Sequence, residues 1–167
     1  RANFNYDIGD LLSSKKRLDK IYRLKKRLSG VSPGEINLEF KTALLDALKD
    51  DLNISIALAK VDEMVNIANT NLDKEPKNKA LKADIMANLE FIKEILGVLY
   101  IDEFEWFQYG FNDEQKEQIA NLINDRNIAK AAKDYTKADL IRDELTALGV
   151  AIMDTPNGVK WEKIWTE

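Results

Sequence analysis

Basic side chains near the C-terminal end of the chain are spaced as on one face of a helix. Arg126, Lys130, Lys133 and Lys137 follow one another at intervals of four, three and four residues, and Tyr135 lies among them. Lysine and arginine bind phosphate oxygens or base acceptors, and an aromatic ring stacks on an unpaired base. This combination of residues is typical of a surface that binds single-stranded RNA.

Two carboxylates add hydrogen-bond acceptors to this stretch. Asp139 follows Tyr135 by four residues, and Asp154 lies in the segment VAIMDTPNGVKW, residues 150–161. A carboxylate accepts hydrogen bonds from base N–H groups, for example those of guanine. The candidate RNA-binding residues are therefore the basic, aromatic and acidic side chains of this region and the tryptophan that ends it: Arg126, Lys130, Tyr135, Asp139, Asp154 and Trp161.

Each of these residues also has a structural interpretation. Lysines and arginines at helical spacing often form a solvated face. Tyr135 could cover the corner between two helices, and Asp139 could complete a capping box with Thr136. Asp154 could be a turn residue, and Trp161 could anchor a small structure to a core. The residues alone leave both interpretations open.

The composition of the chain excludes several kinds of active site. None of the 167 residues is a cysteine or a histidine, so no Cys/His zinc site, cysteine nucleophile or histidine acid–base catalyst can form within it. No phosphate-binding G-x-x-x-x-G-K-[ST] or G-x-G-x-x-G motif is present. No run of about 18 apolar residues occurs, so we expect no membrane span. The sequence therefore predicts no catalytic residue and no metal ligand.

Charge is distributed unevenly along the chain. The net charge is −4, yet residues 1–29 hold nine Lys/Arg and three Asp/Glu, a local net charge of +6. The remaining residues therefore carry −10. This balance argues against a protein that coats nucleic acid over its whole surface, and it requires any RNA site to be local.

The pattern of apolar residues predicts four helices in the first part of the chain. We expect them at roughly residues 7–29 and 36–50, from a cap at Asn53 or Ser55 onward, and over the apolar repeat of residues 81–99. The first helix has an apolar stripe of Ile8, Leu11, Leu12, Leu18, Ile21, Tyr22 and Leu28. Helices joined by short loops predict an antiparallel bundle.

The last part of the chain is predicted to contain two more helices and a β-hairpin. Asn112 and Gln115 have capping-box spacing at the start of a fifth helix, and Gly149 suits the end of a sixth. The dipeptide Asn157-Gly158 fits a type I′ turn between two strands whose alternate residues are apolar. A hairpin of this size is barely stable alone, so we expect it to pack on the two helices.

An aromatic segment, YIDEFEWFQYGF at residues 100–111, separates the two parts. Six of its residues are aromatic and three are acidic, and acidic groups repel RNA phosphates. We therefore expect these rings to pack in a core at a domain junction rather than to stack on bases. The predicted fold class is mainly α: an antiparallel helical bundle at residues 1–110, followed at residues 111–167 by a small helical domain with a C-terminal β-hairpin.

The C-terminal segment is similar to the anticodon-binding region of bacterial cysteinyl-tRNA synthetases. That region follows a pattern close to R-x-x-A-[RK]-x-x-K-D-aromatic-x-x-A-D-x-I-R-D-x-L, and then G-[IV]-x-[LIM]-x-D-T-P-x-G-[TV]-x-W. The matching positions here are Arg126, Ala129, Lys130, Lys133, Asp134, Tyr135, Ala138, Asp139, Ile141, Arg142, Asp143, Leu145, Gly149, Val150, Ile152, Asp154, Thr155, Pro156, Gly158 and Trp161. The segments FNYDIGDLLSSKKRLDKIYRLKKRLSG and FKTALLDALKDDLNISIALAKVDEMVNIAN resemble the DALR-type helical bundle of the same family. The resemblance covers nearly the whole chain.

The resemblance implies that the chain is the C-terminal part of a longer class I aminoacyl-tRNA synthetase, a cysteine–tRNA ligase. Such an enzyme activates cysteine with ATP and transfers it to tRNA-Cys, whose anticodon is G-C-A. ATP and zinc would belong to a catalytic domain of the same chain, because the H-I-G-H and K-M-S-K-S motifs and the zinc ligands of that domain are absent here. This fragment would bind no cofactor, and the intact protein is expected to be a cytoplasmic monomer.

The resemblance also implies roles for individual side chains. Lys130 would lie near the first anticodon base, Tyr135 would stack, and Asp139 and Asp154 would accept hydrogen bonds from bases. The family often has arginine at Lys130 and tryptophan at Tyr135; lysine lacks the bidentate fork of arginine, and tyrosine offers a smaller ring. The alternative function is a non-enzymatic helical protein-interaction module, which the first bundle alone would suit equally well.

Overall fold

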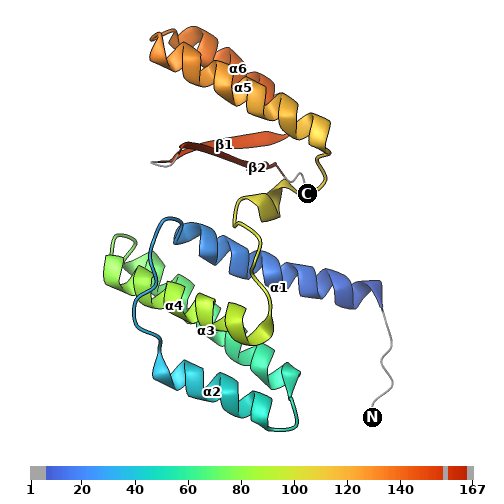
Figure 1. Ribbon diagram of the computed structural model, residues 1–167, viewed down its shortest axis with the longest axis vertical. Coiled ribbons are helices and arrows are strands. Elements are labelled where there is room, and N and C mark those ends of the chain that lie inside the picture. The colour runs from blue at the N-terminus through green and yellow to red at the C-terminus, as the bar shows by residue number, and fades with distance from the viewer. Residues whose placement is uncertain (1–6, 156–157, 165–167) are drawn as a thin grey trace. The chain divides into compact units, whose positions relative to one another are not determined.

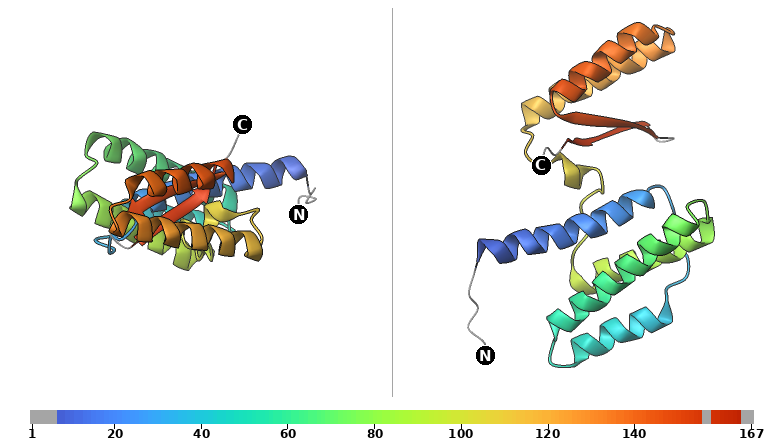
Figure 2. Two further views of the ribbon diagram at one scale, coloured as in Figure 1. Left: turned by 90° about the horizontal axis from the view of Figure 1, so that it is seen from above. Right: turned by 180° about the vertical axis from the view of Figure 1, so that it is seen from behind.

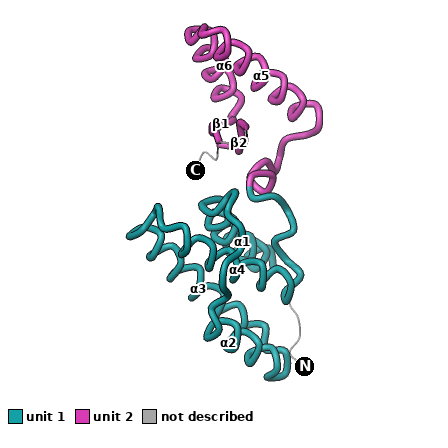
Figure 3. The backbone as a smooth tube through the Cα atoms, turned by 60° about the vertical axis from the view of Figure 1, so that its left-hand side comes forward, with its two compact units in different colours: residues 1–103 teal, residues 104–167 magenta. Residues whose placement is uncertain are grey.

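The computed structural model describes residues 7–155 and 158–164. Its contacts divide the chain into two compact units, residues 1–103 and 104–167 (Figure 3). The change of unit lies within the aromatic segment. The expected boundary at 110/111, between a DALR-type helical bundle and an anticodon-binding domain, stays a prediction.

The first unit is a bundle of four helices (Figure 1). They are α1 (Ile8–Arg27), α2 (Leu38–Lys49), α3 (Ile54–Lys74) and α4 (Lys79–Leu96). Helix α3 contacts each of the other three. The asparagine caps Asn37, Asn53 and Asn78 accept hydrogen bonds from the backbone N–H three residues later, which fixes where α2, α3 and α4 begin. The mainly α fold class is confirmed.

The apolar stripe predicted for α1 is buried only along its second half. Ile21 and Tyr22 are almost fully buried, and so is Leu28 just after the helix. By contrast Ile8 and Leu11 are exposed to 69% and 55%, and Leu12 is similar. The first turns of the stripe are exposed because they extend beyond the other helices of the unit (Figure 1).

The second unit is an α-helical hairpin with a two-stranded sheet packed on it (Figure 2). Its elements are a short 3-10 helix η1 (Glu105–Gln108), α5 (Asp113–Ala131), α6 (Tyr135–Ala147), β1 (Val150–Thr155) and β2 (Gly158–Lys163). The buried centre consists of Ile119, Ile141, Leu145 and Val150, with Phe111, Leu122, Ile123, Ile152 and Trp161 packed against it. The predicted capping box of Asn112 and Gln115 is present at the start of α5.

The antiparallel register of the hairpin differs by one position from the predicted turn. Thr155 pairs with Gly158, so Gly158 belongs to the ladder and the two connecting residues are 156 and 157. The type I′ turn predicted with Asn157-Gly158 at its centre is therefore misplaced, and Asn157 itself lies outside the described residues. Gly158 has a φ of 108°, which glycine adopts without strain.

The aromatic segment packs only in part. Phe104 and Phe107 are buried, as predicted, and Phe111 is packed against the core of the second unit. Tyr100 and Tyr109 are exposed to 68% and 75%, so the core interpretation was wrong for these two rings. Within the described ranges, no helix is both long and apolar enough to cross a membrane.

Candidate nucleic-acid interface

Arg126 lies on the inner face of α5, not on its solvated edge. The apolar residues Ile119, Leu122 and Ile123 precede it at intervals of seven, four and three, and Ala129 follows by three. This spacing places Arg126 on the face that packs on the rest of the unit. Its exposed fraction is 8%. The predicted basic edge is therefore wrong for this residue.

Asp154 faces the same interior because of its place in β1. Side chains alternate across a strand, so Asp154 lies on the face of Val150 and Ile152. In the ladder, Ile152 is opposite Trp161 and Asp154 is opposite Val159. The predicted apolar face of the hairpin is thus confirmed, and the carboxylate at its far end points toward α5.

Arg126, Lys130 and Asp154 form one ion-pair cluster. The Nη1 and Nη2 groups of Arg126 donate to Oδ1 and Oδ2 of Asp154 at 3.0 and 3.1 Å. The Nζ group of Lys130 donates to Oδ2 at 3.1 Å. The hydrogen bonds from Arg126, and then that from Lys130, lower the pKa of Asp154 from 3.8 to about 2. Asp154 is thus ionised at neutral pH.

The cluster leaves Asp154 with little capacity for further hydrogen bonds. An ionised carboxylate has about four acceptor positions. Three are used by Arg126 and Lys130, and the remaining one is on Oδ1. The Asp154 side chain is nevertheless 54% exposed, and that of Lys130 is 40% exposed. The cluster can therefore present one acceptor and an oriented ammonium group to a polar ligand.

The turn between α5 and α6 holds Lys133 in an unusual conformation. Lys133 donates its N–H to the carbonyl of Lys130, and Asp134 donates to the carbonyl of Ala129, which is a Schellman arrangement. The position of Lys133 in this arrangement requires a left-handed backbone, and its φ is 60°. Glycine is the usual residue there, since a side chain costs about 1–2 kcal/mol. The turn therefore carries a cation at a strained position.

Tyr135 and Asp139 lie on the outer face of α6. Asp134 is the N-cap, and its carboxylate accepts a hydrogen bond from the N–H of Lys137 at 3.0 Å. The capping box proposed for Thr136 and Asp139 is therefore wrong, because both lie inside the helix. Residues four apart share a helix face, and both Tyr135 and Asp139 are exposed, Tyr135 to 62%.

Trp161 is a packing residue of the hairpin. Its ring meets that of Phe111 edge to face, with 5.4 Å between centroids and 86° between planes. Its backbone carbonyl accepts a hydrogen bond from Nε2 of Gln108 at 3.1 Å. These contacts fix β2 against η1 and the segment before α5, in agreement with the anchor interpretation.

The six predicted site residues thus fall into three groups. Arg126, Lys130 and Asp154 are bonded together, Tyr135 and Asp139 share the exposed face of α6, and Trp161 packs inside. Among the described residues, no hydrogen bond or ion pair joins the second group to the first. The burial of Arg126 was missed from the sequence, although its spacing from Ile119 and Ala129 already indicated it.

Two family models match the chain, one in each of its two compact units. Residues 112–161 match the Cysteinyl-tRNA ligase anticodon binding domain, and residues 43–100 match the DALR domain. The first range contains every residue of the candidate interface. Curated relatives extend the similarity across both units. A cysteine–tRNA ligase of Campylobacter fetus is 62% identical over 98% of this chain.

The chain belongs to the cysteine–tRNA ligase family. Other relatives named cysteine–tRNA ligase are 56% identical in Campylobacter concisus, over 98% of this chain, and 50% identical in Helicobacter pylori strain G27, over 99%. The chain spans about 35% of the length of such relatives and corresponds to their C-terminal part. Its second unit carries the anticodon-binding domain of this family.

The residues present do not fit the zinc site that the resemblance implies for the family. Zinc sites of that kind use cysteine and histidine ligands, and this chain has neither. In the part of the chain that the structure describes, no group of three or more acidic side chains is arranged to hold a metal ion.

Proposed function

We propose that this chain binds the anticodon loop of tRNA-Cys for a cysteine–tRNA ligase, in which a catalytic domain elsewhere in the intact protein attaches cysteine. The observation that carries this proposal is the exposed pair Tyr135 and Asp139 beside an anticodon-binding-domain turn rich in cations. An aromatic face and a carboxylate on one helix face match an unpaired base, whose ring stacks and whose N–H groups donate.

The ion-pair cluster has a positioning part in this proposal. Arg126 holds the Asp154 carboxylate, and that carboxylate orients the ammonium group of Lys130 toward solvent at the edge of the second unit. Lys130 then donates to an acceptor of the first anticodon base, and the remaining Oδ1 position of Asp154 accepts from a base N–H. Trp161 supports the hairpin from within and makes no contact with RNA.

The sequence preference follows from the polarity of these groups. A guanine presents N–H donors on its Watson–Crick edge, which match a carboxylate, and it presents O6 as an acceptor for Lys130. Adenine reverses this pattern at the exocyclic position. The site therefore favours guanine at the first position of the G-C-A anticodon. Lys133 and Lys137 contribute attraction to phosphates without regard to sequence.

The activity of the intact protein belongs to the same proposal. Its ATP and zinc sites lie in the catalytic domain, outside this chain, and it acts as a monomer in the cytoplasm. The first unit connects the catalytic domain to the anticodon reader. A non-enzymatic interaction module remains the rival function for the bundle, and it predicts no preference among RNA loops.

The test is a titration of this chain with the labelled anticodon stem-loop of tRNA-Cys, beside the same loop with adenine in place of the first anticodon guanine. The proposal expects tighter binding of the guanine loop at both low and moderate salt. Equal affinities that disappear together as salt rises would show backbone electrostatics only, and would contradict base recognition by this chain.

A variant of Asp139 locates the preference on α6. Asp139→Ala should reduce the discrimination between the two loops by about 1–3 kcal/mol if the carboxylate accepts from a base. Glu144→Ala is the matched control, because Glu144 is also an exposed carboxylate of α6 but lies on a different face. A loss of discrimination in both variants, or in neither, would remove Asp139 from the reader.

A further inference from the structure

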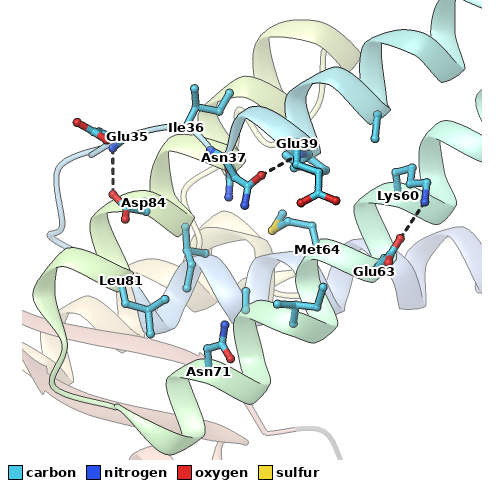
Figure 4. A pocket seen from close by; sticks show the side chains of 16 residues that line it. Glu35, Ile36, Asn37, Glu39, Lys60, Glu63, Met64, Asn71, Leu81 and Asp84 are labelled. Carbon is cyan, nitrogen blue, oxygen red and sulfur yellow. Dashed lines mark hydrogen bonds and ion pairs between the residues drawn. The ribbon is translucent and has the colours of Figure 1, made fainter.

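The bundle of the first unit contains a groove that the anticodon proposal does not use. It is formed by the segment before α2, the first turns of α2, and the facing sides of α3 and α4, and its volume is about 460 Å³ (Figure 4). Apolar side chains line its floor, among them Phe40, Met64, Leu81 and Ile85. A volume of this size accommodates a few side chains of a ligand.

One wall of the groove is held rigidly against α4. The N–H of Gly34 donates to the carbonyl of Ala83 at 2.8 Å, and the N–H of Glu35 donates to Oδ1 of Asp84 at 3.0 Å. The N–H of Asn37 donates to Oδ1 of Asn88 at 2.9 Å. These bonds tie the whole segment before α2 to one helix. The groove is therefore a formed feature rather than a gap between loosely placed elements.

The rim of the groove is acidic. Its lining includes four carboxylates, of Glu35, Glu39, Glu63 and Asp84, and one cation, Lys60. Lys60 is paired with Glu63 at 3.0 Å. The lining thus carries a net charge of −3, and Glu35 and Glu39 have no ion pair within the described residues. Such a rim repels RNA phosphate and attracts lysine or arginine.

Carboxamides provide the remaining polar groups. Asn88 is 94% buried, since its exposed fraction is 6%, and it lines the groove. Its oxygen is used by Asn37, while its amide nitrogen has no hydrogen-bond partner among the described residues. The side chain of Asn71, also in the lining, is equally without a partner there. A carboxamide matches the donor and acceptor of a peptide bond, which favours a polypeptide as the ligand.

We propose that this groove docks a peptide segment of another protein, with an apolar side chain on the floor and lysines or arginines at the rim. The apolar floor supplies burial, the carboxylates select basic neighbours, and Asn71 and Asn88 bond to the peptide backbone. Ile67 extends the apolar lining toward solvent and is 55% exposed. The bound segment would cover it.

The first experiment uses a capped peptide with a central leucine flanked by lysines in a serine background. Its binding to this chain is followed by fluorescence anisotropy, and the site is mapped by NMR of the asparagine side-chain amides. The proposal expects the Asn71 and Asn88 amide signals to shift. It also expects replacement of the leucine by serine to weaken binding at least about tenfold. Equal binding of both peptides would reveal only general attraction to an acidic protein and would overturn the proposal.

Charge reversal at the rim tests whether the peptide binds in the groove. Glu35→Lys/Glu39→Lys should weaken binding of the leucine peptide at least about tenfold. Glu114→Lys/Glu117→Lys is the matched control: Glu114 is the second residue of α5 as Glu39 is of α2, so both variants lose an acidic group near a helix N-terminus. Equal losses in the two variants, or no loss in the first, would overturn the site.

Two further outcomes separate other occupants from the proposed one. If this chain binds the peptide and the intact protein does not, the groove is filled by another part of the same protein, and docking of a separate partner is excluded. If the anticodon stem-loop displaces the peptide, the peptide lies on the RNA surface, and the groove is excluded as its site. The proposal requires binding in the intact protein and no displacement by RNA.

Discussion

Helix α1 and the α5–α6 hairpin both carry lysines and arginines at helical spacing, and they hold these cations in different ways. In α1, Lys15 pairs with Asp19 at 2.8 Å and Arg17 with Asp62 at 3.0 Å, all on partly exposed side chains. In the hairpin, Arg126 is buried and holds Asp154 through two hydrogen bonds. A count of basic residues therefore does not give the cations that are available to RNA.

The largest difference is expected when the carboxylate that pairs with each region's arginine is removed. Asp154→Ala leaves the Arg126 guanidinium buried without its counterion and should destabilise the second unit by about 1–3 kcal/mol. The lower end of this range applies because the carboxylate itself is exposed. Asp62→Ala removes the half-exposed pair of Arg17 and should cost about 0–1 kcal/mol. Urea unfolding measures both; equal costs would show that burial of Arg126 has no energetic consequence.

Acid sharpens this comparison. The pKa of Asp154 is lowered in the folded state, to about 2, so its ion pairs stabilise the fold fully above its ordinary value of 3.8. Their contribution declines as the pH falls from 3.8 through about 2. The stability difference between the parent chain and Asp154→Asn should therefore be constant near neutral pH and shrink in that acidic range. A difference that grows on acidification would contradict the lowered pKa.

Stacking should give the next largest effect, and only on binding. Tyr135→Ala should weaken binding of the anticodon loop by about 1–3 kcal/mol with little change in stability, since the ring is exposed. Tyr109→Ala is the control, because this ring is also exposed in the second unit but lies outside the α5–α6 hairpin. Unchanged affinity of the Tyr135 variant for the loop would make this ring a surface residue without a role in binding.

The cations of α1 should act through salt dependence alone. Lys16 and Lys20 are exposed and have no ion pair within the described residues, unlike Lys15 and Arg17. Lys16→Glu/Lys20→Glu should lower the slope of log affinity against log salt for whole tRNA-Cys by about 1–2, without changing preference for the anticodon. Lys74→Glu/Lys77→Glu is the control, because these lysines are exposed but lie outside α1, and this variant has the same net charge as the first. It should leave the slope unchanged.

The smallest effect concerns the strained turn, where stability and binding should change in opposite directions. Lys133→Gly relieves the left-handed backbone, and after the extra entropy of glycine in the unfolded chain it should stabilise the second unit by about 0.5–1 kcal/mol. It also removes a cation next to the proposed reader, so RNA affinity should fall slightly. Thermal unfolding and the loop titration measure the two effects; weaker stability would contradict the strain.

Local features of this fold could be predicted from the sequence, and distant pairings could not. Apolar periodicity predicted the helices, and the Asn112–Gln115 capping box was predicted because both partners lie within one turn. The pairing of Arg126 with Asp154 spans 28 positions and depends on how the hairpin docks. The misplaced turn has a similar cause: Asn157-Gly158 is a strong local signal, yet the strand register decides which residues connect the strands.

The sequence proposed a set of candidate site residues, and how they are arranged could not be predicted from it. The exposure of Tyr135 and Asp139 agrees with the proposed reader. Thr136 does not cap α6, because the N-cap is Asp134, two residues earlier than that interpretation required. Lys133 gave no sign of strain in the sequence, since a left-handed lysine is visible only once the turn is formed. The strain at Lys133 is a property of the folded backbone and not of the residue type.

The alternation of side chains along β1 places Asp154 on the face of Val150 and Ile152, and this affects the register in which the two strands pair. A shift of β1 by one residue would move Val150 and Ile152 to solvent and bring Met153 to the place of Asp154. Arg126 would then be buried against a thioether with no counterion. The charge pair thus penalises the slipped alignment more than apolar contacts alone would, and it selects a single register for a hairpin too small to fix one by its own ladder.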